Sequence, residues 1–563
     1  MAGLAVAAAA PFLLSGLGAV PFDDPGEGMH AEIAREFLRA GGALPLTLGG
    51  VAYLDKPPLL YALLAAAFSV AGPTEAVARI VSALAALLAI GATAWLGARL
   101  GDARTGLVAG LALLGSLGFF VYGRYVRPDA LFVATLALGF ALALSGLMDR
   151  SPARVVAGLA AFGFAALAKD PLGALAPPLA IGLAMALAGY GRPVARWLPW
   201  PGVVLALGLA FGWWALAEAV TPGFTWYTVV DNHVLNIARA RVFPDEDVPL
   251  SALEFATVAL LGATPWVVSA AGVVGRLARE RAWRDPAEVP WIALALWAVG
   301  VLGLTALSPF RLPHYGLPAY PAVALLAARG WRDLGVRWLA AAHAVLLGAL
   351  ALVCALAWVT DGAAFISGVI AVSDVAARKS ALALGPPPVP AWPSFQPLVG
   401  ATALVLGGGT VALAIAAVTR RRAFAAYATI VTLSLLLPGA AAGLSLVSAH
   451  RAVKGIANEV RQRAAPDDVV AHEGPIENAG ALEWYSGRRP VIVDGRRSVL
   501  GFGATRVESR ETFWDEARLE QAWQGPHRVW LVTGRPPAHS VVARLVDARL
   551  VAVGGGRRLY VNR

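Results

Sequence analysis

Long apolar runs alternate with short polar breaks along most of the chain. A helix that crosses a bilayer needs about 20 predominantly apolar residues, and thirteen runs approach or reach that length. They lie at 4–20, 75–98, 106–122, 129–147, 154–168, 172–190, 198–217, 255–274, 289–307, 315–328, 338–358, 397–418 and 424–447. The first could also be a cleaved signal peptide, but no basic segment precedes it. The pattern predicts an all-α polytopic membrane protein with about 13 transmembrane helices.

The pattern changes after residue 448, where the chain becomes polar. Helix-like stretches (452–464, 476–485 and 541–547) alternate there with strand-like ones (469–472, 490–494, 528–533 and 559–562). Such alternation is typical of α/β structure. We therefore expect a transmembrane domain over 1–448 and a small C-terminal α/β domain over 449–563.

Arginine orients the predicted spans. Every second connection is rich in arginine: Arg99 and Arg104; Arg150 and Arg154; Arg192 and Arg196; Arg276, Arg279, Arg281 and Arg284; Arg329, Arg332 and Arg337; and Arg420, Arg421 and Arg422. Cytoplasmic loops carry such an excess. With an odd number of spans, the N-terminus is expected in the cytoplasm and the C-terminus, with the α/β domain, outside it.

Composition agrees with this class and excludes others. The chain has 563 residues, of which 58% are hydrophobic and 15% charged, and its net charge is +10. Soluble domains carry about 25% charged residues. The arginines are spread between apolar runs rather than clustered, which argues against a nucleic-acid binder. Cys354 is the sole cysteine, so no internal disulfide can form.

The first predicted outer loop, residues 21–74, begins with a cluster of acids. Asp23, Asp24 and Glu27 directly follow the first apolar run, where charge is costly to place. From Glu27 onward, apolar and charged residues alternate with helical spacing, and a Gly-Gly pair at 41–42 can end the helix. We expect this amphipathic helix to lie in the membrane interface.

A second motif in the same loop joins an acid to a lysine ahead of two prolines. Asp55 and Lys56 precede Pro57-Pro58, and proline favours the first turn of a helix. Asp55 could be a helix cap. Lys56 beside the N–H groups of a helix N-terminus could instead hold a phosphate.

Further charged residues lie at the short outer turns. These are Arg124, Arg127 and Asp129; Lys169 and Asp170; and Arg311, His314 and Tyr315. Arginines on the outer side run against the positive-inside trend. They either pair with nearby acids, as Arg127 could with Asp129, or bind an anion.

The outer loop 218–254 contributes a histidine that could bind a metal or carry a proton, although a lone histidine is more often structural. This is His233. Together with Asp55 it is a candidate metal ligand, but no ligand spacing requires a metal. The nearby 245–247 triplet of acids lacks a βαβ context for a nucleotide-sugar site and is read as a solvated turn.

These residues place carboxylates and cations on one face of a membrane bundle. A cationic pocket at that level suits a phosphate whose lipid tail lies in the bilayer. A carboxylate base together with cations that stabilise a departing phosphate is what inverting sugar transfer requires.

The motifs resemble those of the bacterial lipid-linked sugar transferases, which include the aminoarabinose transferases of lipid A and are related to protein O-mannosyltransferases in the C-type glycosyltransferase superfamily. The matching segments are 27–36, 53–61, Arg79, 122–129, 169–171 and 311–318. The resemblance implies transfer of a sugar from a polyprenyl phosphate, typically undecaprenyl phosphate, to a glycolipid, glycan or protein acceptor at the outer face of the bacterial cytoplasmic membrane.

The resemblance also implies an Asp-Glu pair at the start of the first outer loop, with the aspartate as the suspected catalytic residue. Aligned on the following helix, Glu27 falls on that glutamate but Gly26 falls on the aspartate. Asp24 is therefore the expected base and Glu27 its rival. The expected ligands of the donor phosphate are Lys56, Arg124, Arg127, Lys169 and Arg311, and the expected supporting residues are Asp55, Asp129, His233, His314 and Tyr315.

Two other classes of function remain compatible with the sequence. A transporter or flippase of lipid-linked sugars would need the same anionic-lipid pocket, although no inverted repeat, which is common in transporters, is visible. A scaffold would use the C-terminal domain to bind another protein. The sugar and the acceptor do not follow from the sequence.

Overall fold

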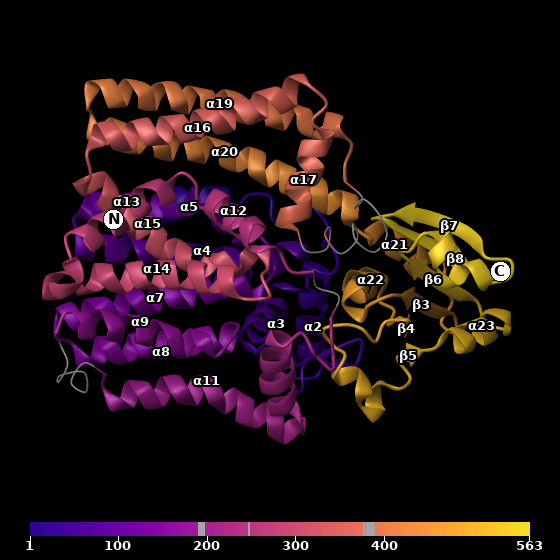
Figure 1. The fold of residues 1–563 in the computed structure, drawn as a ribbon. Helices are drawn as coiled ribbons and strands as arrows, with labels where there is room; N and C mark the ends of the chain where they lie inside the picture. Colours follow the sequence, from indigo (N-terminus) through magenta and orange to yellow (C-terminus); the bar gives the residue numbers. More distant parts are fainter. Residues whose placement is uncertain (190–197, 246–247, 375–377, 379–388) are drawn as a thin grey trace.

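The computed structural model describes residues 1–189, 198–245, 248–374, 378 and 389–563. Long helices lie side by side in one bundle, and a smaller sheet-containing region packs at one end of it (Figure 1). The N-terminus lies toward the end of the bundle that faces away from this sheet, and the C-terminus lies in the sheet region (Figure 1).

Helices dominate the first 451 residues, as the apolar runs predict. They are α1 (Ala2–Leu14), α4 (Glu75–Leu100), α5 (Ala103–Leu114), α6 (Leu117–Tyr122), α7 (Pro128–Met148), α8 (Pro152–Ala168), α9 (Leu172–Leu187), α11 (Trp200–Val220), α12 (Ala252–Gly262), α13 (Trp266–Arg279), α14 (Val289–Leu307), α15 (Tyr320–Asp333), α16 (Val336–Val359), α17 (Ala363–Ser373), α19 (Trp392–Thr419) and α20 (Arg422–Arg451). Each of the thirteen predicted runs therefore contains helix.

Fewer of these helices are long enough to cross a bilayer alone. Seven helical segments among the described residues have the length and apolar composition of a span, and the pair α12 and α13, bent by 103°, could form an eighth. Several of the others, such as α5 and α8, have 10–17 residues. The helical, multi-pass character is confirmed, while the number 13 stays a prediction.

A mixed six-stranded sheet organises the C-terminal region. Its strands are β3 (Val469–Glu473), β4 (Val491–Val493), β5 (Phe513–Trp514), β6 (Val529–Thr533), β7 (Arg549–Gly554) and β8 (Arg557–Val561), in the order β5-β4-β3-β6-β8-β7. Strands β5, β4, β3 and β6 are parallel to one another, and β8 is antiparallel to both of its neighbours, β6 and β7. Helix α21 (Lys454–Arg463) precedes β3, α22 (Gly480–Ser486) lies between β3 and β4, and α23 (Glu516–Gln524) lies between β5 and β6. The sequence predicts four of the six strands and misses β5, β7 and α23.

The first long loop, residues 21–74, joins the bundle to this sheet region. It contains the predicted amphipathic helix α2 (Glu27–Arg39), a short hairpin of β1 (Thr47–Leu48) and β2 (Val51–Ala52), and α3 (Leu59–Ala71). The hairpin turns at Gly49 and Gly50, both with positive φ, as two-residue turns between antiparallel strands require.

Helix α2 does not have the open polar face that the sequence predicts. It packs against α3 and α22, and its acids Glu32 and Glu36 are buried. The polar side of the helix is therefore covered by protein, while its place in the membrane interface stays a prediction. The acids face segments that are hundreds of residues away in sequence: Arg489, in the loop after α22, lies 3.7 Å from a carboxylate oxygen of Glu36.

Candidate functional site

A cavity of about 1580 Å³ lies where the ends of the bundle helices meet the loops that connect them. Its lining joins charged residues from the loops to apolar residues from the helices. The charged and polar lining includes Asp23, Asp24, Asp55, Lys56, Arg127, Asp129, Lys169, Asp170, His233, Arg241, Asp245, His314, Tyr315, Asp374 and Glu477. The apolar lining includes Leu179, Leu183, Leu304, Val369, Val399 and Val447. Such a lining suits a ligand with an anionic head and a hydrocarbon tail.

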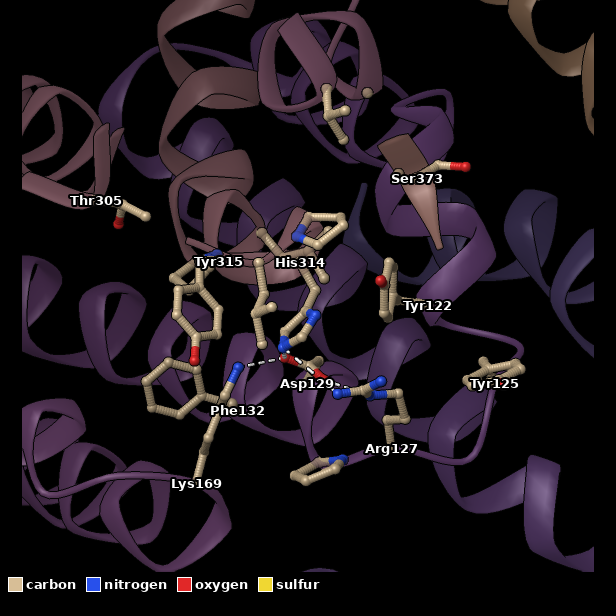
Figure 2. Close-up of a pocket in the computed structure, with 18 of the residues that line it drawn as sticks. Tyr122, Tyr125, Arg127, Asp129, Phe132, Lys169, Thr305, His314, Tyr315 and Ser373 are labelled. Atoms are coloured by element: carbon tan, nitrogen blue, oxygen red, sulfur yellow. Dashed lines mark hydrogen bonds and ion pairs between the residues drawn. The ribbon is translucent and has the colours of Figure 1, made fainter. Parts of the chain in front are cut away.

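Asp129 is the centre of the charged part of the cavity (Figure 2). Pro128 begins α7, which places Asp129 in the first helical turn, and Lys169 follows the last residue of α8. The ammonium group of Lys169 donates a hydrogen bond to Asp129 Oδ1, and Arg127 Nε lies 3.3 Å from Oδ2 (Figure 2). The ion pair between Arg127 and Asp129, left open by the sequence, is thus present, and both cations still line the cavity.

His314 and Tyr315 complete this cluster from the turn before α15. His314 Nε2 lies 4.0 Å from Asp129 Oδ1 and 3.5 Å from Arg127 Nη2. Burial, together with the positive charge of Arg127 and Lys169, holds the pKa of His314 well below its ordinary value, so its ring is neutral near pH 7. Lys169 Nζ lies 5.1 Å from the centroid of the Tyr315 ring, within the range of a cation–π contact.

Asp55 and Lys56 line the same cavity from the loop before α3. Lys56 Nζ lies 2.5 Å from Asp55 Oδ2, and each side chain is about one quarter exposed. Burial raises the pKa of Asp55, but the charge of Lys56 outweighs that effect and lowers it below the ordinary value. Lys56 is therefore a cation that faces the cavity while it is held by a neighbouring acid.

His233 contacts Asp170, the residue after Lys169. It belongs to a π-helical segment, η1 (Trp226–Leu235), and its Nδ1 is 2.6 Å from the carbonyl oxygen of Thr228. Its Nε2 lies 3.6 Å from a carboxylate oxygen of Asp170, and this interaction raises the pKa of His233. Within the described residues, the one group of three potential metal ligands is Glu32, Glu36 and Glu483. The structure thus does not gather Asp55 and His233 into a metal site with a third ligand.

The acids of the first loop have different partners. Glu27 is fully buried and binds Arg79 with both carboxylate oxygens, and the N–H of Val126 donates to it as well. It is absent from the cavity lining. Burial raises the pKa of Glu27, against the effect of the Arg79 charge. This arrangement is that of a structural ion pair.

Asp24 lines the cavity but is tied to the C-terminal region. Its Oδ1 accepts a hydrogen bond from the N–H of Ala481, 2.8 Å away, and its Oδ2 accepts one from Arg557 Nη1, 3.2 Å away. Burial raises the pKa of Asp24 to about 6, against the effect of Arg557.

Asp23 also lines the cavity, although the sequence motifs select Asp24 instead. Its Oδ1 accepts a hydrogen bond from the hydroxyl of Tyr125, 2.5 Å away. Burial raises the pKa of Asp23, and the bond from Tyr125 opposes that rise. The available sequence signal for Asp23 is its place beside Asp24 at the end of the first apolar run, which does not distinguish the two.

Two predicted phosphate ligands lie outside the cavity lining. Arg124 donates to the carbonyl oxygens of Phe12, Leu13 and Ser15 at the end of α1. Arg311 donates to the carbonyl oxygens of Leu250, Ala306 and Ser308. Both arginines thus satisfy backbone acceptors at helix ends and in loops, and the geometry does not favour a phosphate role for either.

Comparison with known proteins agrees with the cavity and the fold. Residues 55–215 match the family described as dolichyl-phosphate-mannose-protein mannosyltransferase. The undecaprenyl phosphate-alpha-4-amino-4-deoxy-L-arabinose arabinosyl transferase of Aeromonas salmonicida is 27% identical over 333 residues, which cover 57% of this chain and 58% of the relative. The corresponding enzyme of Pseudomonas aeruginosa is 29% identical over 54% of each chain. The matched sequence thus spans little more than half of these relatives.

The structural likeness extends farther than the sequence match. The crystal structure of ArnT from Cupriavidus metallidurans bound to undecaprenyl phosphate aligns with 100% of this chain and 98% of its own, with a TM-score of 0.78 and 23% identity. Its apo form aligns equally well. The resemblance that the motifs indicate is therefore confirmed: the chain is similar in sequence to lipid-linked sugar transferases, and its fold is that of the ArnT structures.

Proposed function

We propose that the protein transfers a sugar from a polyprenyl-phosphate donor to a lipid, glycan or protein acceptor at the outer face of the bacterial cytoplasmic membrane. The observation that carries this proposal is the cavity, in which Lys56, Arg127 and Lys169 meet an apolar wall at the end of a membrane bundle. The cationic part fits the phosphate, and the apolar wall fits the polyprenyl chain.

The chemistry requires two kinds of group, and the cavity offers both. The three cations would bind the donor phosphate and stabilise the charge that develops on it as the bond to the sugar breaks. A carboxylate of the first loop would accept the proton of the acceptor. Direct attack of the acceptor on the anomeric carbon inverts its configuration, since no covalent sugar–enzyme intermediate intervenes.

The names of the relatives suggest the first substrates to test. Undecaprenyl phosphate 4-amino-4-deoxy-L-arabinose would be the donor, and lipid A would be the acceptor that the family resemblance implies. Asp55 and His233 line the cavity and remain the candidate ligands should a divalent cation take part.

We also propose the topology that the arginines predict, with about thirteen spans, a cytoplasmic N-terminus and an extracytoplasmic region 449–563. Contacts between arginine-rich connections support it. Arg99 and Arg154 both bind Asp149, while Arg276 and Arg422 donate to the adjacent carbonyls of Asp333 and Leu334. These pairs of connections thus lie together, as loops on one side of a membrane would.

Reconstitution in vesicles tests this function against the alternative of a flippase. We expect radiolabelled sugar to move from the polyprenyl phosphate to the acceptor when purified protein is present. Movement of labelled donor across the bilayer without transfer would support the flippase and contradict the proposed enzyme.

A further inference from the structure

We propose that the two adjacent aspartates of the first loop have different roles: Asp23 is the catalytic base, and Asp24 is a positioning residue that ties this loop to the C-terminal region. The inference rests on the proposed function and deepens it. It follows from the hydrogen-bond partners of the carboxylates near the cavity. Within the described part of the chain, one oxygen of Asp23 has no such partner, whereas both oxygens of Asp24 and of Glu27 do.

Glu27 and Asp24 are the carboxylates that the sequence favours, and both have their two oxygens occupied. Glu27 is held by Arg79 and lies outside the cavity lining. Asp24 is held by the N–H of Ala481 and by Arg557, and its side chain is 1% exposed. A base must reach the proton that it accepts, and these contacts would have to break first.

Asp23 is held through one oxygen. Its Oδ1 accepts hydrogen bonds from the Tyr125 hydroxyl, at 2.5 Å, and from the N–H of Glu27, at 3.3 Å. Among the described residues no hydrogen-bond donor contacts its Oδ2, and Asp23 lines the cavity. The carboxylate is thus fixed in orientation while one oxygen remains available to a substrate.

Gly26 allows the tyrosine to take this position. A Cβ atom at Gly26 would lie 2.0 Å from the hydroxyl oxygen of Tyr125, a distance that no side chain can occupy. The place where the family resemblance implies a catalytic aspartate is therefore filled by the tyrosine hydroxyl, which binds Asp23 instead.

The C-terminal region holds the same loop from the other side. The hydroxyl of Tyr485 accepts a hydrogen bond from the N–H of Phe22, one residue before Asp23. Asp24 contacts Ala481 and Arg557 one residue after it. Contacts from residues 449–563 therefore flank Asp23, which gives this region a role in positioning the base.

In the proposed reaction, the acceptor hydroxyl oxygen bonds to the anomeric carbon of the donor sugar, and its proton passes to Asp23 Oδ2. The bond between that carbon and the phosphate oxygen breaks, and its electron pair leaves with the polyprenyl phosphate. Lys56, Arg127 and Lys169 receive this anion. The step needs no other reactant.

Several titratable groups surround Asp23 and affect its pKa. They are Tyr125, Asp24, Glu27, Arg79, Asp374 and Arg451. Of these, Tyr125 donates directly to the ionised form and so favours it. Loss of the Tyr125 hydroxyl should therefore move the acid limb of the rate profile to higher pH.

The test compares full-length wild type with Asp23→Asn, Asp24→Asn, Arg557→Gln and Tyr125→Phe. Transfer is measured with the donor that wild type uses, and undecaprenyl phosphate binding is measured separately. We expect Asp23→Asn to lower kcat at least about 100-fold, as general base removal does, with unchanged lipid binding, which also reports that the variant is folded. Tyr125→Phe should shift the acid limb upward.

Asp24 and Arg557 should behave as one positioning unit. We expect Asp24→Asn and Arg557→Gln to lower kcat to a similar, smaller extent, and the double variant to lose no more than either alone. The inference is overturned if Asp24→Asn abolishes transfer while Asp23→Asn retains a tenth or more of it, or if Tyr125→Phe leaves the pH profile unchanged. A wild type that transfers no sugar would instead contradict the proposed function.

Discussion

Replacement of Lys56 by glutamine should weaken the binding of the donor phosphate specifically. Lys56 lines the cavity, and its side chain is 26% exposed. A hydrogen bond to a charged group contributes about 1.5–3 kcal/mol, and about 1.4 kcal/mol corresponds to a tenfold change in affinity. Because Lys56 is partly exposed to solvent, the lower part of this range applies. We expect Kd for undecaprenyl phosphate to rise about 10- to 30-fold.

The neighbouring acid adds to the effect of this substitution. Lys56 is 2.5 Å from Asp55, so its loss leaves a carboxylate facing the incoming phosphate. Addition of Asp55→Asn to Lys56→Gln removes that repulsion and should recover part of the lost affinity. The double variant should therefore bind undecaprenyl phosphate more tightly than Lys56→Gln alone, because it lacks the negative charge of Asp55.

Arg124→Gln is the matched control, since the sequence predicts the same phosphate role for both cations. Arg124 binds carbonyl oxygens at the end of α1 and lies outside the cavity lining. We expect it to lower the thermal stability but to leave Kd within about twofold. Binding is measured with purified protein in nanodiscs containing labelled undecaprenyl phosphate. Unchanged Kd in Lys56→Gln together with a tenfold loss in Arg124→Gln would refute the assignment.

Three further results are expected. Asp129→Asn should lower the thermal unfolding midpoint far more than Asp149→Asn. Asp129 is buried among three cationic or basic side chains, whereas Asp149 is partly exposed. Equal shifts of the midpoint would contradict a stabilising role of the buried Asp129 cluster. Burial raises the pKa of Asp24 from 3.8 to about 6, so between these pH values the folded protein keeps a proton that the unfolded chain releases. The free energy of unfolding therefore falls as pH rises from 3.8 to about 6. Asp24→Asn should flatten this part of the stability profile. Gly26→Ala should lower kcat, since the added methyl group would displace a hydroxyl 2.0 Å away; an unchanged kcat would argue against the packed loop.

The sequence predicts the helical part of the fold well because membrane spans depend on local composition. Each apolar run contains helix, and the break of α12 and α13 at Pro265 is the clearest departure within a run. The lengths are less predictable, since α1 ends at Leu14 rather than near residue 20. Short strands such as β5, with two residues, carry too little pattern to be found.

The cationic cluster could also be predicted, because its members lie at short turns that the arginine pattern assigns to the same side of the membrane. Arg127 and His314 each lie next to a proline, and Lys169 lies two residues before one. The structure brings all three to Asp129. The partners of the first-loop acids could not be predicted. Asp24 and Arg557 are 533 residues apart in sequence, and no local pattern indicates such a contact.

Sugar transfer in reconstituted vesicles shows whether the protein is a transferase and whether Asp23 is its base. Wild type and Asp23→Asn are incubated with a panel of radiolabelled polyprenyl-phosphate sugars, and a membrane extract supplies the acceptors. With wild type, we expect label to move from one of these lipids to an extract component at least about 100-fold faster than with the variant. Absence of transfer from every donor, with labelled lipid crossing the bilayer instead, would contradict it.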